Sequence, residues 1–390
     1  MFLSYPGKKE ERDILEGTRR ARLRSLSGKG ARSRLIQGDN LAILNALLDS
    51  HRKSISLVYI DPPFATNTLF RIGATRANTI SSSDEDPLAY SDKLLGAEFL
   101  EFLRERLVLL RELLSENGSI YLHIDYKIGH YVKILMDEIF GARNFRNDIA
   151  RIKCNPKNFH RRAYGNVKDL ILFYSRSKEP TWNEPTAAYS DEDMSRLFKK
   201  TDGAGRKYTT IPLHAPGETA NGETGRAWRG LLPPKGRHWR SKPDVLEDWH
   251  ARGLIEWSAN GVPRKKIFAD EASGKRAQDI WDFKDPQYPQ YPTEKNLDLL
   301  KRIVSASSNP GDLVLDCFCG SGTTLIAAEQ LRRSWIGVDA SKQAIAVARK
   351  RLQDLNKTGV VEFEVMSDAD GSLAAEDTEQ ASLGPIRMSA

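Results

Sequence analysis

Four consecutive residues, Asp61-Pro62-Pro63-Phe64, carry groups that could act on the amino group of a planar base. The nitrogen of such an amine is a weak nucleophile, because its lone pair is delocalised into the ring. The Asp61 carboxylate and the Pro62 carbonyl could accept its two protons and localise the lone pair, while Phe64 could stack on the base. Two prolines would hold this loop rigid, so the acceptors would need little reorganisation. The alternative is an ordinary turn after a strand, because Asp-Pro and Pro-Pro are turn formers.

A second group of residues has the spacing of a nucleotide-binding loop. The sequence Asp316-Cys317-Phe318-Cys319-Gly320-Ser321-Gly322-Thr323-Thr324 follows a short apolar run and leads into an expected helix. Glycines let the backbone come close to a ligand, and the start of a helix carries partial positive charge. A dinucleotide loop would need a third glycine where Leu325 stands, and a P-loop would need a lysine. At the end of the next strand, Asp339 could accept both ribose hydroxyls of a nucleoside cofactor. The alternative is a tight turn that binds no ligand.

In their order along the chain, the two motifs resemble those of the permuted, β-type DNA amino-methyltransferases, the N6-adenine and N4-cytosine family. The chain is similar from Leu35 to Leu355 to type III modification subunits and bacterial adenine-specific DNA methyltransferases. Asp61-Pro62-Pro63-Phe64 resembles their catalytic motif, and the glycine loop resembles their S-adenosylmethionine loop. The resemblance implies an α/β, Rossmann-like methyltransferase fold with permuted motif order. It also implies S-adenosylmethionine as cofactor and a base flipped out of double-stranded DNA as substrate.

The same resemblance extends to residues outside the two motifs. Lys295 lies in Pro292-Thr293-Glu294-Lys295-Asn296, which is similar to the motif that flanks the cofactor pocket in the family. Asp39 and Asn40 stand where the family contacts the cofactor adenine, although Gly-Asp-Asn is also an ordinary turn. Arg151 stands near a position where the family often has an aromatic residue against the target base.

The first residue of the catalytic motif bears on the target atom. In the family, Asp at the position of Asp61 favours adenine N6, whereas Ser is usual in cytosine N4 enzymes. Methylation of cytosine C5 is excluded on chemistry, because the sequence has no Pro-Cys nucleophile motif. Cytosine N4, an RNA substrate and a catalytically silent DNA-reading subunit of a restriction-modification complex stay open as alternatives. A homodimer and a restriction subunit as partner stay open as well.

Composition and charge fit a large protein that binds a polyanion. The chain has 390 residues and a net charge of +7, and this length favours two folded units. No apolar run of about 18 residues is present, so no membrane span is expected. The three cysteines form no disulfide framework and lack the spacing of a zinc site, so no metal site is expected. With the resemblance, these features predict a cytoplasmic, nucleoid-associated protein of bacterial or phage origin.

The elements that would position the motifs alternate as in an α/β protein. Apolar runs predict strands at 35–37, 55–60, 119–124, 149–152, 170–174, 313–315 and 335–338. Helical periodicity predicts helices at 41–48, 97–116, 128–140, 294–307, 322–332 and 341–355. A methyltransferase domain is therefore expected in two parts, a catalytic half at 28–178 and a cofactor half at 285–365. The polar segment 65–92 is expected to be a loop that could close over the flipped nucleotide.

Three segments depart from this alternation. Residues 1–27 are basic and weakly periodic, which predicts an N-terminal arm or short helix outside the core. Residues 366–390 have the composition of a disordered acidic tail. Residues 179–284 form an irregular insert, where the family carries its target-recognition domain. Within it, the acid-free run 226–242 interleaves tryptophans with cations. This run predicts DNA contact through Arg226, Arg229, Lys235, Arg237, His238 and Arg240. The alternative is a Trp-anchored loop with a solvated basic rim.

Overall fold

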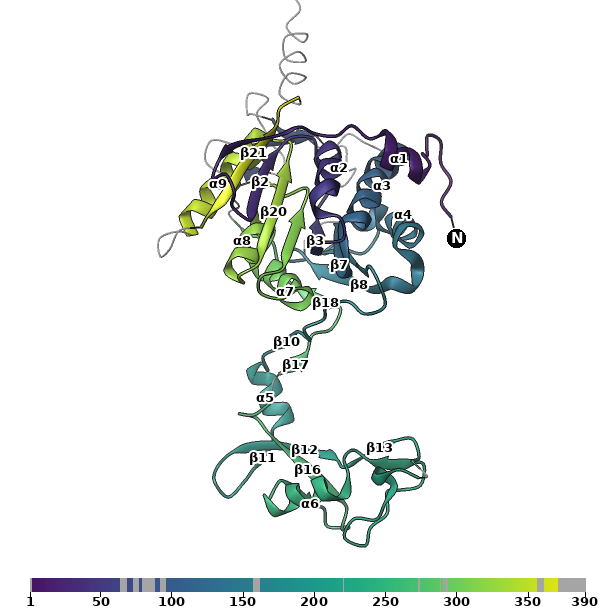
Figure 1. Ribbon diagram of the computed structural model, residues 1–390. Helices are drawn as coiled ribbons and strands as arrows, with labels where there is room; N and C mark the ends of the chain where they lie inside the picture. The colour runs from purple at the N-terminus through teal and green to yellow at the C-terminus, as the bar shows by residue number, and fades with distance from the viewer. Residues whose placement is uncertain are drawn as a thin grey trace, which may run out of the picture. The chain divides into compact units, whose positions relative to one another are not determined.

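The chain folds into two compact units, which are coloured along the sequence in Figure 1. The computed structural model describes residues 2–63, 69–72, 77–78, 88–91, 96–156, 162–219, 221–272, 274–287, 289, 291, 294–355 and 361–370. Unit 1 comprises Met1–Pro185 and Gln278–Ala390, and unit 2 comprises Thr186–Ala277. Unit 2 therefore falls inside the insert that the sequence marks at 179–284.

Unit 1 is built on a ten-stranded sheet in the order β1-β21-β2-β20-β19-β3-β7-β9-β8-β18. The strands from β21 to β7 run parallel, whereas β1 and β9 pair antiparallel with their neighbours. The strand bounds are β1 Leu23–Ser27, β2 Ser33–Gln37, β3 Ile55–Ile60, β7 Leu114–Ile124, β8 Phe145–Ile152, β9 Lys168–Ser175, β18 Ile280–Asp282, β19 Leu313–Asp316, β20 Ser334–Asp339 and β21 Phe363–Asp368. This sheet is the expected Rossmann-like α/β architecture.

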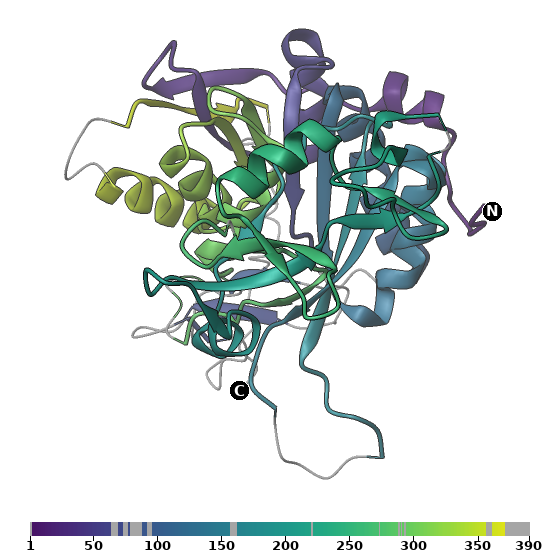
Figure 2. The same cartoon turned by 90° about the horizontal axis from the view of Figure 1, so that it is seen from below.

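Helices cover both faces of this sheet (Figures 1 and 2). Successive side chains of a strand point to opposite faces, so Val58 and Ile60 join one apolar core while Leu57 and Tyr59 join the other. Because both faces are buried, the central strands are continuous apolar runs in the sequence. The helices of the first core are α2 Asn40–His51, α3 Gly96–Leu113 and α4 Tyr126–Met136, followed by the short turns η1 Asp137–Gly141 and η2 Ala142–Asn144. Those of the second are α7 Leu297–Ser307, α8 Thr323–Gln330 and α9 Lys342–Asp354.

The two motifs are neighbours in the sheet although they are far apart in the sequence. β3 pairs in parallel with β19, with Leu57 opposite Val314 and Val58 opposite Leu315. The catalytic motif follows β3 and the glycine loop follows β19, so both lie at the carboxyl edge of adjacent parallel strands. This edge is where open α/β sheets bind their ligands.

Residues 11–27 pack on the core and pair with the sheet, so the prediction that this stretch lies outside the core is wrong. Helix α1, Glu11–Gly17, buries Ile14, and Arg111 of α3 donates a hydrogen bond to the Glu11 carboxylate at 2.8 Å. Strand β1 then pairs antiparallel with β21. Neither packing could be predicted from hydrophobic periodicity. Helix α1 buries a single residue, and β1 is a mostly exposed edge strand.

The carboxyl-terminal segment is also partly structured. β21 lies between β1 and β2, and it includes residues 366–368, which were expected to be disordered. Asp368 is buried and forms an ion pair with Arg19 at 2.5 Å, and it accepts a hydrogen bond from the backbone N–H of Arg22. The acidic segment 366–390 therefore begins inside β21. The rest of the predicted tail, residues 371–390, lies outside the described residues.

Truncation before Ser367 is expected to destabilise the protein. It removes the end of β21, which pairs with β1 and with β2, and it removes the carboxylate that binds Arg19. We expect a melting temperature lower by roughly 5 °C or more in a thermal unfolding scan. Truncation after Asp370 is the matched control, because it keeps the whole of β21. Equal melting temperatures for the two truncations would show that this strand end contributes nothing.

The segment 65–92 contains three short strands where a loop was expected. β4 Leu69–Ile72 pairs antiparallel with β5 Ala77–Asn78 and with β6 Leu88–Ser91. The remaining residues of this segment, and Phe64 of the catalytic motif, lie outside the described residues.

Unit 2 has a small core of its own, formed by Leu213, Trp228, Trp239, Leu246 and Ile255. Its main sheet is antiparallel, in the order β11-β12-β16-β15, and β13 and β14 form a separate pair. The bounds are β10 Thr186–Ala187, α5 Asp191–Leu197, β11 Lys200–Thr201, β12 Lys207–Pro212, β13 His214–Pro216, η3 Glu223–Gly225, β14 Arg237–Trp239, α6 Pro243–Ala251, β15 Ile255–Trp257, β16 Pro263–Phe268 and β17 Lys275–Arg276. Elements this short explain why the sequence shows no clear period here.

Candidate catalytic and cofactor site

Asp61 lies at the carboxyl end of β3 with one carboxylate oxygen engaged and the other without a partner. Its Oδ2 forms an ion pair with the Lys295 ammonium, and its side chain is 15% exposed. Its Oδ1 lies 3.9 Å from His123 Nδ1 and has no hydrogen-bond partner among the described residues. A buried acceptor without a partner is costly, so this oxygen is suited to receive a donor from a bound substrate. Pro62 beside it is buried, and Pro63 is half-buried.

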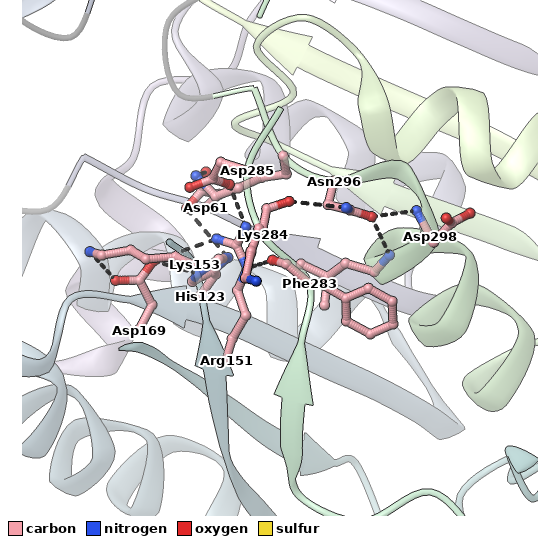
Figure 3. Close-up of polar contacts among 12 residues, drawn as sticks. Asp61, His123, Arg151, Lys153, Asp169, Phe283, Lys284, Asp285, Asn296 and Asp298 are labelled. Atoms are coloured by element: carbon pink, nitrogen blue, oxygen red, sulfur yellow. Dashed lines mark hydrogen bonds and ion pairs between the residues drawn. The ribbon is translucent and has the colours of Figure 1, made fainter. Parts of the chain in front are cut away.

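A buried polar network lies behind Asp61 (Figure 3). His123 Nε2 lies 3.3 Å from Asp169 Oδ2, and a carboxylate only accepts, so Nε2 carries the proton. Burial lowers the pKa of His123, so the ring is neutral and its Nδ1 accepts from the Tyr59 hydroxyl at 2.9 Å. The Lys153 ammonium donates to the other oxygen of Asp169 at 2.5 Å. His123 is therefore fixed in one tautomer and supports the loop that carries Asp61.

The glycine loop needs glycine at two positions. Gly320 has φ 49° and Gly322 has φ 79°, both in the left-handed region. A Cβ on Gly322 would also come within 3.0 Å of the Ala348 Cβ. The Gly322 N–H donates to the Cys319 carbonyl at 2.8 Å, which closes the turn immediately before α8. This loop therefore presents its backbone closely to any ligand at the helix start, as a nucleoside cofactor requires.

Asp339 holds this loop to the end of β20. Its Oδ2 accepts from the Gly320 N–H at 2.9 Å, and its Oδ1 accepts from the Ser341 N–H at 2.8 Å. Burial raises the pKa of Asp339. A carboxylate has about four acceptor positions, so two remain for ribose hydroxyls. Asp339 thus fits the ribose role while it also shapes the loop.

Asp316 is a buried acid at the end of β19, directly beside the glycine loop. Its side chain accepts from the Phe318 N–H at 3.0 Å. Burial raises the pKa of Asp316 to about 7, and the charges of Asp61 and Asp339 act in the same direction. A carboxyl group in this state favours a cationic ligand group, because the opposite charge stabilises its ionised form.

Binding of S-adenosylmethionine, which carries a cationic ammonium and a sulfonium, is therefore expected to release a proton from Asp316. The raised pKa means that the free protein holds this proton below about pH 7 and loses it above, so affinity should rise between about pH 6 and pH 8. Titration calorimetry in two buffers of different protonation enthalpy counts the released protons. Asp316→Asn should abolish the release. Proton release that is unchanged in this variant would assign it to another group.

Several residues that the sequence assigns to the cofactor are engaged with the protein. The Asn40 amide donates to the Cys317 carbonyl at 2.7 Å and accepts from Arg106 Nε at 2.6 Å, so it braces α2 against the loop. The hydroxyl of Thr323 accepts from Arg351 at 3.1 Å. Lys295 pairs with Asp61, which places it at the catalytic motif.

Two other assigned residues, Asp39 and Phe318, lie at the edge of this site. Asp39 caps α2 by accepting from the Leu41 N–H at 3.2 Å, and its side chain is half exposed. The Phe318 ring is partly buried and packs against Phe102, with ring centroids 6.0 Å apart. Asp39 also pairs with Arg106 at 3.4 Å, and a cofactor role for Asp39 and Phe318 stays a prediction.

Three residues of this site gave no signal in the sequence. Arg106 stacks on the Phe102 ring at 3.6 Å and also bonds Asn40. Arg351 of α9 donates to the Ser321 hydroxyl at 2.7 Å and pairs with Glu294. Tyr291 is buried next to Gly320, and burial raises its pKa to about 12. In the sequence the two arginines resemble ordinary surface cations of amphipathic helices, because their partners are distant in the chain.

The residues of the basic run 226–242 differ in how far they are buried or paired within unit 2. Its tryptophans, Trp228 and Trp239, are buried core residues. Arg229 is bound by both oxygens of Glu247, at 2.9 and 2.5 Å, so its charge is offset. His238 donates from Nδ1 to the Gly217 carbonyl at 2.8 Å. The structure therefore supports a Trp-anchored core and leaves a smaller set of cations for a ligand.

The remaining cations gather around the β13–β14 pair. Arg226, Lys235, Arg237 and Arg240 are exposed. Arg237 lies 3.2 Å from His214 Nδ1, and Arg240 donates to the Pro212 carbonyl at 3.1 Å. Arg264 is opposite Pro212 in the β12–β16 pair, so the three arginines belong to neighbouring positions of unit 2. Like charges that cluster on a surface attract a polyanion. Arg264 was not predicted from the sequence, because it lies in β16, outside the acid-free run.

Within the described part of the chain, no group of three or more His, Cys, Asp or Glu side chains could hold a metal ion. None of the described helices is long and apolar enough to cross a membrane.

The chain is similar to several known proteins. The family model described as DNA methylase, for N6 and N4 methyltransferases, matches residues 55–350. The chain is 41% identical to the Type II methyltransferase M.EcaI of Enterobacter cloacae, over 90% of this chain and 77% of that protein. It is 24% identical to the probable type III restriction-modification enzyme HindVI Mod subunit of Haemophilus influenzae, over 85% of this chain and 51% of that subunit. The crystal structure of the M1.HpyAVI–SAM complex aligns with 82% of this chain and all of that chain, at 19% identity and a TM-score of 0.43.

Proposed function

The chain belongs to the N6/N4 DNA methylase family, and from this premise we propose that it methylates adenine N6 at a defined sequence in double-stranded DNA. The observation that carries the proposal is the Oδ1 of Asp61, which has no hydrogen-bond partner in the described part of the chain and lies at the end of β3 beside the glycine loop. S-adenosylmethionine is the cofactor of this family, and it supplies an electrophilic methyl group. The glycine loop, Asp316 and Asp339 fit such a cofactor, because the loop is open to close approach and both acids border it.

The chemistry that the protein supplies is hydrogen-bond acceptance at a fixed position. Asp61 Oδ1 and the Pro62 carbonyl would accept hydrogen bonds from the two amino N–H groups of the flipped base, which turns the nitrogen lone pair away from the ring. The proton that the nitrogen loses after it bonds to the methyl group would pass to the Asp61 carboxylate. Prolines on both sides of the second acceptor keep this geometry rigid before the substrate arrives. His123 does not act as the base in this scheme, because its Nδ1 already accepts from Tyr59.

The choice of adenine over cytosine rests on the acid at position 61. The family resemblance associates Asp with adenine N6 and Ser with cytosine N4. Single-molecule sequencing of DNA from cells that express the protein tests this choice, because it shows the modified base together with its sequence context. We expect N6-methyladenine at one recurrent site. Recurrent N4-methylcytosine would replace the proposal with the alternative target.

The proposed DNA-reading surface of unit 2 is the cluster of Arg237, Arg240 and Arg264 with Lys235 and Arg226. Base edges and phosphates both accept from guanidinium groups, so the cluster can provide sequence recognition and affinity. The names of the Mod-subunit relatives extend the proposal to a restriction partner, although the chain spans about half the length of the HindVI subunit.

Removing two charges of this cluster is expected to weaken DNA binding without changing cofactor binding. Arg237→Ala with Arg240→Ala should flatten the log–log salt dependence of DNA affinity by up to about 2, if both contact phosphate. If one of them contacts a base edge, its loss should cost about 1–3 kcal/mol at one position of the site. Binding titrations at several salt concentrations measure both effects.

Arg252→Ala is the matched control, since Arg252 lies in the same unit and pairs with Asp248 at 3.2 Å. It should leave the salt dependence unchanged. If the double variant and the control both keep the parental affinity and salt slope, the recognition surface lies elsewhere in the protein.

A further inference from the structure

The segment that follows unit 2, residues 278–285, joins the sheet of unit 1 beside the buried polar network of His123 and Asp169. It is called the returning segment below. β18 pairs in parallel with β8, with Trp281 opposite Arg151. The Ala150 N–H also donates to the Asp279 carbonyl at 2.9 Å. The Trp281 side chain is buried in the second core of unit 1. The chain is thus fixed as soon as it returns from unit 2.

Arg151 then anchors the next residues of this segment (Figure 3). Its Nε donates to the Phe283 carbonyl at 2.8 Å, and its guanidinium also pairs with the Asp285 carboxylate. The Asp285 N–H donates to the Lys153 carbonyl at 3.0 Å. Arg151 therefore holds the backbone and a side chain of the segment, which is a role different from stacking on a base.

This anchor is rigid because its charges are buried. The Arg151 side chain is fully buried, and its NH1 lies 3.6 Å from Asp169 Oδ2. Burial opposes ionisation of Asp169, yet the hydrogen bond from His123 and the charge of Lys153 hold the pKa of Asp169 well below its usual range. Breaking a buried ion pair leaves an uncompensated charge, which is strongly unfavourable. Arg151 therefore links the returning segment to the network behind Asp61.

A second fixed point lies just beyond Lys295. The Asn296 amide donates to the Lys284 carbonyl at 3.0 Å, and its Oδ1 caps α7 by accepting from the Asp298 N–H at 2.9 Å. Lys295 is next to this cap, is 8% exposed, and places its ammonium on Asp61 Oδ2. The position of this ammonium is thus set by the returning segment on one side and by α7 on the other.

We propose that Lys295 is a positioning residue for Asp61. Arg151 holds Lys295 in place through its contacts with Phe283 and Asp285 and through the hydrogen bond from Asn296 to the Lys284 carbonyl. With its Oδ2 fixed by Lys295, the carboxylate cannot rotate freely, so Oδ1 stays directed toward the amine. The stretch of chain that leaves unit 2 therefore sets the orientation of the catalytic carboxylate. This inference rests on the proposed function, because it concerns the acceptor role of Asp61.

Lys295→Met tests the inference, since it keeps the length of the side chain and removes the charge. We expect the single-turnover rate of methyl transfer to fall by about 10–100-fold, because a misplaced acceptor loses its orientation. Affinity for S-adenosylmethionine, measured by calorimetry, should stay within about twofold of the parent. Lys295→Arg should restore most of the rate. Lys301→Met is the matched control, because it removes the same charge from α7. The ammonium of Lys301 lies 4.0 Å from Asp298, so this lysine pairs with a different carboxylate.

A double variant separates positioning from a direct role of Lys295. If Lys295 acts through Asp61, Lys295→Met should cause no further loss of rate in an Asp61→Asn background. Additive losses of rate in the double variant would overturn the inference. A loss of cofactor affinity that accounts for the whole effect of Lys295→Met would also overturn it, and would assign Lys295 to cofactor binding. Parental rate in Lys295→Met with an inactive Asp61→Asn would also overturn it and leave the proposed function intact. Parental rate in Asp61→Asn itself would overturn both.

A second variant tests the contribution of the returning segment and covers the case in which Lys295→Met does not fold. Asp285 is 40% exposed, and Asp169 still lies 3.6 Å from the Arg151 guanidinium when Asp285 is removed. Asp285→Ala therefore releases one contact of the Arg151 anchor without leaving its buried charge uncompensated. We expect a slower methyl-transfer rate with unchanged cofactor affinity and a melting temperature close to the parent. A parental rate in this folded variant would show that the anchor does not influence Asp61.

Discussion

Replacing Asp61 with alanine is expected to lower the rate of methyl transfer by about 10²–10³-fold or more, the range seen when one oriented polar group is removed from an active site. The physical reason is the loss of the acceptor at Oδ1, which has no other hydrogen-bond partner among the described residues. Affinity for S-adenosylmethionine should stay close to the parental value, because Asp61 follows β3 and the glycine loop follows β19. Single-turnover transfer of a labelled methyl group and calorimetry measure the two quantities.

Asp61→Asn provides the matched control for size and hydrogen bonding. The amide can offer its oxygen either to Lys295 or to the substrate, and in each case its nitrogen places a donor where an acceptor is needed. A large loss of rate is therefore expected for this variant as well. Transfer at a parental rate in Asp61→Ala would remove Asp61 from the chemistry and with it the proposed mechanism.

Asp339→Ala is expected to weaken S-adenosylmethionine binding by about tenfold or more, since a hydrogen bond to a charged group contributes roughly 1.5–3 kcal/mol. The structure adds a second reason for this loss. Asp339 accepts from the Gly320 and Ser341 N–H groups, so its removal also leaves two loop donors without their acceptor. Calorimetry of the variant with the cofactor alone measures the effect without DNA.

The control for Asp339→Ala is Asp354→Ala, which removes the same charge from an exposed position at the end of α9. It should bind the cofactor as the parent does. Equal affinities in Asp339→Ala and the parent would contradict the ribose assignment and would show that the loop keeps its shape without this acid.

The sequence predicted the parts of the fold that have a continuous or periodic apolar pattern. β3 and β19 are buried on both faces, so their runs and the motifs behind them were visible without a structure. β1 and β21 were not predicted, because one is a mostly exposed edge strand and the other mixes acidic with apolar residues. Unit 2 was seen only as an irregular insert, because its strands are too short to show a period.

For the candidate site, the sequence indicated which residues surround the chemistry, and the structure shows what they contact. Lys295 was assigned to the cofactor by resemblance, whereas its ammonium pairs with Asp61. The roles of Arg106, Arg151 and Arg351 depend on partners that are distant in the chain, and no local pattern reports such pairs. Arg229 shows the opposite effect, because Glu247 on a neighbouring element neutralises a cation that the sequence presents as available.

The most direct test of the central claim is the identity of the methylated nucleoside. The purified protein would be incubated with plasmid DNA and S-adenosylmethionine carrying an isotope-labelled methyl group, and the digested DNA would be analysed by mass spectrometry. We predict labelled N6-methyldeoxyadenosine with the parent protein and none with Asp61→Ala. Labelled N4-methyldeoxycytidine, or the absence of label from DNA with a folded protein that binds the cofactor, would contradict the account.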